Sequence, residues 1–271
     1  SADGGAPERP RSSLVRLQAG APGRRPLFLV HQVGGHVFTF RALARELGAA
    51  QPVYGLRAQG LEAAEEPLGS AEEMAALYLR LVREAQPAGP YRIGGASMGG
   101  MVAFEMAHQL TAAGEEVELL TLMDTPCGDQ MPPRPESDGE FVATVFAGRA
   151  AFTREELSSP CAEELLTYAV AKAKAADPAG GLELDEARRL FHVLKANVAA
   201  LFDYTPRPWP GRMLFFRAEA RRPGDPLRPE LSWIELARGG IEIRLVPGDH
   251  ESMHAQSNVH QMAERLKDLL R

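Results

Sequence analysis

Short apolar runs alternate with amphipathic segments along most of this chain of 271 residues. Runs rich in Val, Ile, Leu and Phe are typical of strands that are buried on both faces of a parallel sheet. They predict strands at 27–31, 53–57, 91–97, 119–124, 213–219 and 241–248. Helical periodicity between these runs predicts helices at 38–47, 70–86, 98–113 and 258–271. The alternation indicates an α/β fold with a mostly parallel central sheet and helices on both faces.

Two stretches depart from this alternation and set the predicted domain organisation. Residues 1–13, "SADGGAPERPRSS", are rich in Pro, Gly and Ser, which is typical of an interdomain linker before a domain at 14–271. Between about 126 and 204 no strand pattern occurs, and helical patterns follow at 161–176 and 185–204. A helical insertion between two strands predicts a lid over a site, and the alternative is a packing subdomain without a catalytic role.

Composition and charge argue against several classes of partner. The formal net charge is −6 with both signs mixed along the chain, so we expect neither a nucleic-acid partner nor an anionic membrane. No run approaches the ~20 apolar residues that span a bilayer. Cys127 and Cys161 form no CxxC pair, and no apolar leader pattern is present, so we expect reduced thiols in a cytoplasmic protein.

The stretch "GASMG" at 95–99 matches G-x-S-x-G, the turn that presents a nucleophilic serine between a strand and a helix. The context agrees, because "YRI" before it is typical of a strand and "MVAFEMAHQL" after it of a helix. A phosphate-binding loop would need G-x-G-x-x-G or G-K-[ST], and neither occurs. Ser97 is therefore the candidate nucleophile.

Such a serine needs a histidine base and a carboxylate that orients it, in the chain order Ser, Asp or Glu, His. His250 follows the last predicted strand and is the first candidate base, and His254 is the second, although loop histidines are also common without a role. Asp124 ends one predicted strand, whereas Asp225 lies in the loop that follows the next, with Glu219 as a weaker neighbour. The residue pattern does not choose between these acids.

The oxyanion of an acyl-transfer intermediate needs two backbone N–H donors. One should belong to Met98, the residue after the nucleophile, and the other to a loop after an early strand. The stretch "LVHQVGGHVF" at 29–38 provides such a loop, with Gly34 and Gly35 available to turn the backbone. A plain tight turn would explain these glycines equally well.

The stretch "HESMHAQSNVH" offers a competing interpretation, a zinc hydrolase that would use His250, His254 and His260. It matches a metalloprotease signature except for Ser257, which stands where that signature has glycine. The H-E-x-x-H pair must lie on one helix, but a strand and "PGD" precede it here. We therefore expect no metal.

With these motifs assembled, the chain resembles the type I thioesterase domains that end modular nonribosomal peptide and polyketide synthetases, over about residues 14–270. The blocks "SLVRLQAG", "RRPLFLVHQVGGHVFTFRALARELGAAQPVYGLRAQGL", "GPYRIGGASMGGMVAFEMAHQL" and "VPGDHESM" follow the order and wording of that family. The resemblance implies an α/β-hydrolase fold with a helical lid insertion at about 126–204. It also implies a serine thioesterase with Ser97 as nucleophile, Asp124 as acid, His250 as base and the amides of Val33 and Met98 as oxyanion donors.

Two positions depart from the family pattern. Gln32 stands where a proline is usual, which alters the expected rigidity of the loop that carries the Val33 amide. Ala96 stands before the serine, where a bulkier residue is often found. The resemblance also favours Asp124 over Asp225 as the acid.

The resemblance implies release of an acyl or peptidyl thioester through an acyl-serine, by hydrolysis or by intramolecular cyclisation. The substrate would arrive on the phosphopantetheine arm of a carrier-protein domain upstream in the same polypeptide, and no bound cofactor would be needed. Apolar lid residues are candidates to line the acyl chamber or to form the lid's core: Phe141, Phe146, Phe152, Leu190 and Leu194. The alternatives are a stand-alone serine esterase or lipase, an editing thioesterase, and an interaction module without activity.

Overall fold

The computed structural model describes residues 12–159, 161–177, 181–222 and 225–271, and these contain a seven-stranded sheet in the order β1-β3-β2-β4-β5-β6-β7. All neighbouring strands are parallel except β1, which pairs antiparallel with β3. The strands are β1 Leu14–Gln18, β2 Leu27–Val30, β3 Val53–Leu56, β4 Tyr91–Ala96, β5 Val117–Met123, β6 Met213–Ala218 and β7 Ile241–Val246. The predicted α/β-hydrolase fold class is confirmed.

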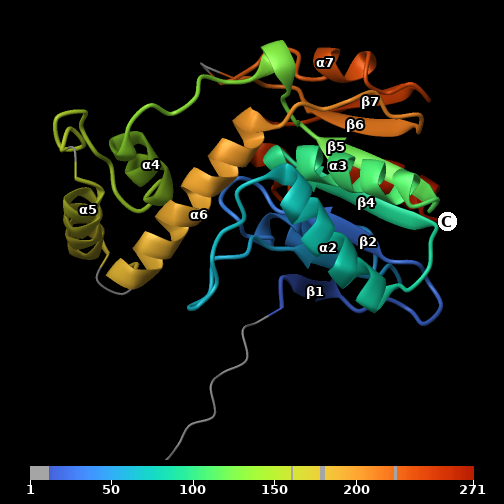
Figure 1. Ribbon diagram of the computed structural model, residues 1–271, viewed down its shortest axis with the longest axis horizontal. Helices are drawn as coiled ribbons and strands as arrows, with labels where there is room; N and C mark the ends of the chain where they lie inside the picture. Colours follow the sequence, from blue (N-terminus) through green and yellow to red (C-terminus); the bar gives the residue numbers. More distant parts are fainter. Residues whose placement is uncertain (1–11, 160, 178–180, 223–224) are drawn as a thin grey trace, which may run out of the picture.

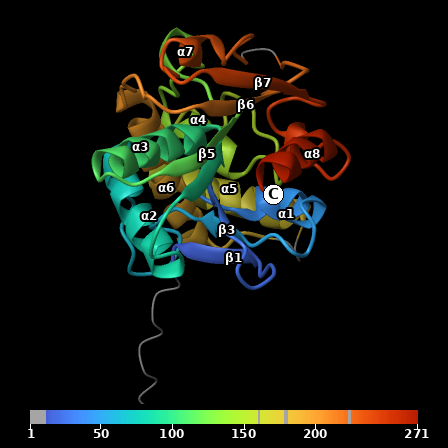
Figure 2. The ribbon, with the colours of Figure 1, turned by 90° about the vertical axis from the view of Figure 1, so that its right-hand side faces the viewer.

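Helices cover both faces of the sheet because successive strand residues point to opposite sides. Phe28 and Val30 of β2 pack toward α2 (Ala71–Ala85) and α3 (Met98–Ala112). Leu27 and Leu29 pack toward α1 (Arg41–Glu46) and α8 (His260–Leu269). Figure 2 shows the two helix pairs on opposite sides of the sheet. None of the helices in the described ranges is long and apolar enough to cross a membrane.

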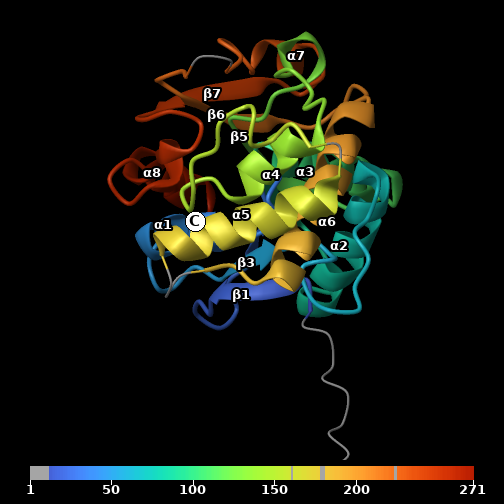
Figure 3. The ribbon, with the colours of Figure 1, turned by 90° about the vertical axis from the view of Figure 1, so that its left-hand side faces the viewer.

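Between β5 and β6 the chain forms a helical insertion with its own apolar core, built by α4 (Asp138–Val145), α5 (Ala162–Ala176) and α6 (Leu184–Asp203). α6 belongs to two cores: Phe191 and Leu194 pack within the insertion, whereas Ala200 and Leu201 near its end join the core beside α3. Figure 1 shows α6 running from the outlying α5 to the sheet, and Figure 3 shows α5 on the outer side. α6 therefore connects the insertion to the sheet.

The six predicted strands are confirmed, but β1 was missed. It is a short edge strand whose residues are only partly buried, so it carries no continuous apolar run. Helix α4, which the sequence pattern does not predict, begins at Asp138 and is capped by Ser137, whose hydroxyl accepts from the amide of Glu140. The remaining short elements are η1 Phe38–Phe40, η2 Gly128–Gln130, α7 Leu231–Ile234 and η3 Ser252–His254. The linker predicted at 1–13 lies, apart from residues 12 and 13, outside the described residues.

Candidate active site

The candidate residues gather at one edge of the sheet. Because β2 and β4 to β7 are parallel, their carboxyl ends meet at the same edge. Ser97 directly follows β4, Asp124 directly follows β5, and His250 lies four residues beyond the end of β7. These three residues line one cavity of about 240 Å³.

Ser97 occupies a sharp turn between β4 and α3, with φ 53° and ψ −126°. This positive φ is rarely adopted by residues other than glycine, and the surrounding structure holds it. The Ser97 amide donates to the carbonyl of Met123 (2.9 Å). A Cβ on Gly95 would lie 2.2 Å from the carbonyl carbon of Gly99, so only glycine lets the first turn of α3 pack this closely on β4.

Asp124 and His250 are joined by a direct hydrogen bond: Nδ1–H of His250 donates to Oδ2 of Asp124 (2.8 Å). Asp124 as a whole residue is 2% exposed, and its carboxylate also accepts from the amide of Ala218 (3.0 Å) and twice from Arg221 (2.8 Å each). Burial by itself would raise the pKa of Asp124, but the bonds from His250, Arg221 and Ala218 outweigh it and lower that pKa. Asp124 is therefore ionised at neutral pH.

The pKa of His250 is shifted in the opposite direction to that of Asp124. Burial lowers its pKa, but the hydrogen bond and charge of Asp124 outweigh burial, and the pKa is raised above its ordinary value. The bond at Nδ1 leaves Nε2 as the second ring nitrogen, which is the atom that a serine base needs. Among the described residues no hydrogen bond joins His250 to Ser97, and catalytic contacts often tighten only when substrate is bound.

The structure places the alternative acids and base away from these contacts. Asp225 lines the same cavity, but its Oδ2 accepts from the amide of Arg222 (2.8 Å) in a local turn. Glu219 is exposed just after β6. His254 is buried in η3 against the ring of Phe40, and burial lowers its pKa to about 4.

The three histidines of the zinc motif lie in three different surroundings. His250 bonds Asp124, His254 is buried beside Phe40, and His260 is exposed at the start of α8 next to Glu46. No single helix holds the first two. Within the described residues, no group of three or more His, Cys, Asp or Glu side chains could hold a metal ion.

The loop after β2 is held by its own backbone and by α6. The carbonyl of Gln32 accepts from the amide of Gly35 (2.8 Å) and from Nδ1 of His31 (2.6 Å). Both bonds use the carbonyl, so they do not depend on the side chain at position 32. Nδ2 of Asn197, which is 1% exposed on α6, donates to the carbonyl of Val33 (2.7 Å). No described oxygen accepts from the amides of Val33 or Met98.

The cavity beside Ser97 is mainly apolar and is closed largely by the helical insertion. Its other lining residues are Val33, Pro126, Pro132, Pro133, Pro135, Phe141, Thr144, Leu194, Val198, Leu201, Phe202, Asp225 and Pro226. Of the predicted chamber residues, Phe141 and Leu194 line it. Phe146, Phe152 and Leu190 do not line it, and they contact only the insertion's apolar core, to which Phe141 and Leu194 also belong. An apolar cavity of this kind suits an apolar acyl chain.

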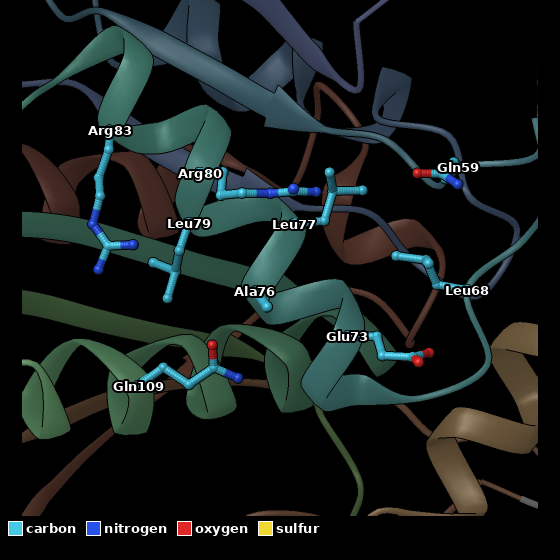
Figure 4. A pocket seen from close by; sticks show the side chains of 9 residues that line it. All are labelled: Gln59, Leu68, Glu73, Ala76, Leu77, Leu79, Arg80, Arg83 and Gln109. Carbon is cyan, nitrogen blue, oxygen red and sulfur yellow. The ribbon is translucent and has the colours of Figure 1, made fainter.

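A second hollow, of about 560 Å³, lies along α2 (Figure 4). Its Arg83 is paired with Glu115, and Gln109 from α3 donates to Glu105 and to the backbone of Glu72. None of the candidate catalytic residues lines it. Arg83 and Gln109 thus bond to residues outside the lining of this hollow.

Comparison with known proteins decides the family. The sequence profile of the thioesterase domain matches residues 25–270. The chain belongs to the thioesterase domain family. Over 221 residues it is 33% identical to a dimodular nonribosomal peptide synthase of Bacillus subtilis (strain 168). That match covers 80% of this chain, which spans only 9% of the relative's length.

Solved structures agree with this thioesterase assignment. A four-domain nonribosomal peptide synthetase, holo-AB3403 bound to AMP and glycine, matches with a TM-score of 0.86 at 26% identity, over 97% of this chain and 20% of that one. The NocB thioesterase domain, in covalent complex with a fluorophosphonate nocardicin G analogue, matches with a TM-score of 0.70 at 26% identity, over 95% of this chain and 99% of that one.

Sequence reasoning missed two residues that touch the candidate site, Arg221 and Asn197. Arg221 lies in a run of charged residues after β6, and Asn197 is one polar residue on an amphipathic helix. A sequence signal for Asn197 is weak but real, since a buried asparagine on the apolar face of a helix needs a partner.

Proposed function

We propose that this thioesterase domain releases an acyl or peptidyl chain from the phosphopantetheine arm of a carrier protein through an acyl-serine intermediate. The observation that carries the proposal is the bond between His250 and the buried Asp124, in an apolar cavity that also exposes the strained Ser97 turn. The relatives are multidomain synthetases, which supports a carrier protein in the same polypeptide as the partner.

In the proposed reaction, Nε2 of neutral His250 takes the proton of Ser97 as Oγ attacks the thioester carbonyl. Asp124 holds the imidazole and stabilises the imidazolium, and the amides of Val33 and Met98 bind the oxyanion. The C–S bond then breaks, and the pantetheine thiol leaves with the proton from His250. Water, or a hydroxyl or amine of the chain itself, then attacks the acyl-serine carbonyl while His250 takes its proton. The ester bond to Ser97 Oγ breaks, His250 returns the proton to Oγ, and the product is an acid or a ring.

The helical insertion at 126–204 serves as the lid in this proposal, and residues 1–13 as the linker to the carrier. Phe141 and Leu194 would contact the acyl chain and exclude water, which favours attack by the chain's own nucleophile over hydrolysis.

Substrate preference tests the proposed function. We expect kcat/KM for an acyl N-acetylcysteamine thioester to exceed that for the p-nitrophenyl ester of the same acyl group by at least about tenfold. The same acyl group on a holo-carrier protein should react faster still. Product masses would distinguish the acid from the ring. An equal or greater rate with the oxoester and no gain from the carrier would contradict the proposal and favour a simple esterase.

Asn197→Leu is expected to lower kcat by about tenfold while KM changes little, because the Val33 carbonyl loses its bond from α6 and the adjacent oxyanion amide loosens. Steady-state kinetics with the thioester would measure both constants, with circular dichroism as the check of folding. Asn197→Asp keeps the side-chain size but brings a carboxylate to the Val33 carbonyl, so it should be at least as impaired. A wild-type kcat in folded Asn197→Leu would show that α6 does not set the oxyanion loop.

A further inference from the structure

Among the described side chains, Arg221 makes the most hydrogen bonds to the Asp124 carboxylate. Its Nη1 donates to Oδ2 and its Nη2 to Oδ1, both at 2.8 Å, so the guanidinium grips both oxygens. Nη2 also donates to the carbonyl of Ala218 (3.1 Å). The Arg221 side chain is 12% exposed and that of Asp124 is 1% exposed. Arg221 and Asp124 thus form a largely buried, bidentate ion pair, and the carboxylate of this pair is the group that bonds His250.

Backbone hydrogen bonds position the segment that carries Arg221. The amides of Glu219 and Ala220 donate to the carbonyls of Val246 and Gly248 (2.9 Å each), which continues the pairing of β6 with β7 beyond both strands. The two segments that carry Arg221 and His250 are therefore bonded to each other. The backbone hydrogen bonds between 219–220 and 246–248 therefore hold the segment of Arg221 beside the segment of His250.

We propose that Arg221 is a positioning residue that acts through Asp124: it fixes the carboxylate with Oδ2 toward His250 and offsets part of its charge, which keeps His250 available as a neutral base. The effect of Arg221 on the protonation of His250 does not depend on which reaction the site performs, whereas its effect on catalysis rests on the proposed function.

The geometry supports both parts. Oδ2 accepts from His250 Nδ1 and from Arg221 Nη1, and Oδ1 accepts from Ala218 and Arg221 Nη2, so the carboxylate cannot rotate without breaking several bonds. Because Arg221 and His250 bond the same oxygen atom, their nitrogens lie within two hydrogen-bond lengths of each other. A guanidinium this close disfavours a second positive charge on the imidazole.

The other charged groups around His250 do not replace this cation. Asp124 from the end of β5, Asp225 from the loop after β6 and the adjacent Glu251 all favour the imidazolium. His254 from η3 is neutral, because burial lowers its pKa to about 4. Arg222 pairs with Asp249 and also interacts with Glu251 and Asp225, so Arg221 is the cation that contacts Asp124 itself. Without Arg221 the Asp124 carboxylate would keep its full charge toward His250, and the pKa of His250 would rise further.

The test is a titration of His250 by NMR, using ¹³C-labelled histidine and a His250→Gln variant to assign the signal. In Arg221→Gln we expect the pKa of His250 to rise by about one unit relative to wild type. Arg228→Gln removes an exposed arginine that pairs with Glu230 instead, and should leave the titration unchanged. An unaltered His250 titration in folded Arg221→Gln would overturn the proposal, whatever the enzyme's substrate.

Kinetics supply the second readout. Because a neutral His250 is required, a higher pKa moves the acid limb of kcat/KM to higher pH, and we expect kcat in Arg221→Gln to fall about tenfold with KM little changed. Arg221→Lys keeps the positive charge but loses the bidentate geometry of the guanidinium. The acid limb of kcat/KM should therefore return to its wild-type pH, while kcat recovers only in part. If Arg221→Gln does not fold, Arg221→Lys decides alone, and a full wild-type kcat there would contradict the positioning role.

Ser97→Ala, assayed in parallel, separates the two proposals. Turnover by Ser97→Ala would refute the proposed function and leave the titration to decide the role of Arg221. Turnover that requires Ser97, together with a wild-type titration and pH profile in Arg221→Gln, would refute only the role of Arg221.

Discussion

Ser97→Ala is expected to lower kcat for thioester release by about 10⁴-fold or more. Alanine has no atom that can form the acyl intermediate, and only oxyanion binding and substrate orientation would remain. The fold should be unchanged, because the Ser97 side chain caps no helix and alanine differs only by the hydroxyl. Thiol release, followed with a chromogenic disulfide, measures the rate, and thermal unfolding checks the fold.

Ser232→Ala is the matched control for Ser97→Ala. The Ser232 hydroxyl bonds Asp129 on the surface, outside the cavity, so its loss should leave kcat within about twofold. Comparable activity in Ser97→Ala and Ser232→Ala would remove Ser97 from the chemistry. The G-x-S-x-G turn would then have only a structural role.

Asp124→Asn is expected to lower kcat by about 10³- to 10⁴-fold. The amide is neutral, so it cannot stabilise the imidazolium, and it can present an NH₂ group to His250 and so impose the wrong tautomer. It also leaves the buried Arg221 opposite an uncharged group, which should reduce thermal stability. Kinetics and unfolding curves on the same preparation would separate the two effects.

Stability against pH gives a second check on Asp124. Its pKa in the folded protein is lowered, so its contribution to the free energy of unfolding is present above its unfolded-state pKa and is lost as pH falls through the folded-state pKa. The difference in melting temperature between wild type and Asp124→Asn should therefore shrink toward acid pH. A difference that stays constant would contradict the buried ion pair.

Asp225→Asn compares the two candidate acids directly. Asparagine can still accept the bond from the Arg222 amide, so the loop should keep its turn. We expect a loss at least about 100-fold smaller than in Asp124→Asn, since Asp225 makes no hydrogen bond with His250 in the described part of the chain. A larger loss in Asp225→Asn would reverse the assignment.

The sequence predicts those parts of the fold that have a periodic signal. Strands such as Leu27–Val30 are buried on both faces and appear as apolar runs, whereas the half-buried β1 has no such run. The serine turn has a local motif, which made Ser97 accessible to sequence reasoning. The choice of Asp124 over Asp225 is different, because both follow strand ends. It depended on family resemblance, and only the folded chain places Asp124 against His250.

Other parts of the site depend on tertiary packing that a single sequence does not encode visibly. Phe141 in α4 and Phe146 just after α4 both belong to the insertion's core, yet only Phe141 also lines the cavity, whereas Phe146 is completely buried. Arg221 contacts Asp124 across 97 residues of sequence, and Asn197 contacts Val33 across 164. Such partners become visible only when the strand order and the path of α6 are known.

Intact-protein mass spectrometry during turnover of an acyl N-acetylcysteamine thioester tests the central claim most directly. We expect wild type to gain the mass of the acyl group, the peptide that contains Ser97 to carry it, and Ser97→Ala to gain nothing. Turnover without any adduct on the protein would contradict an acyl-serine mechanism at this site. An adduct that persists in Ser97→Ala, for instance on the exposed Cys161, would contradict it as well.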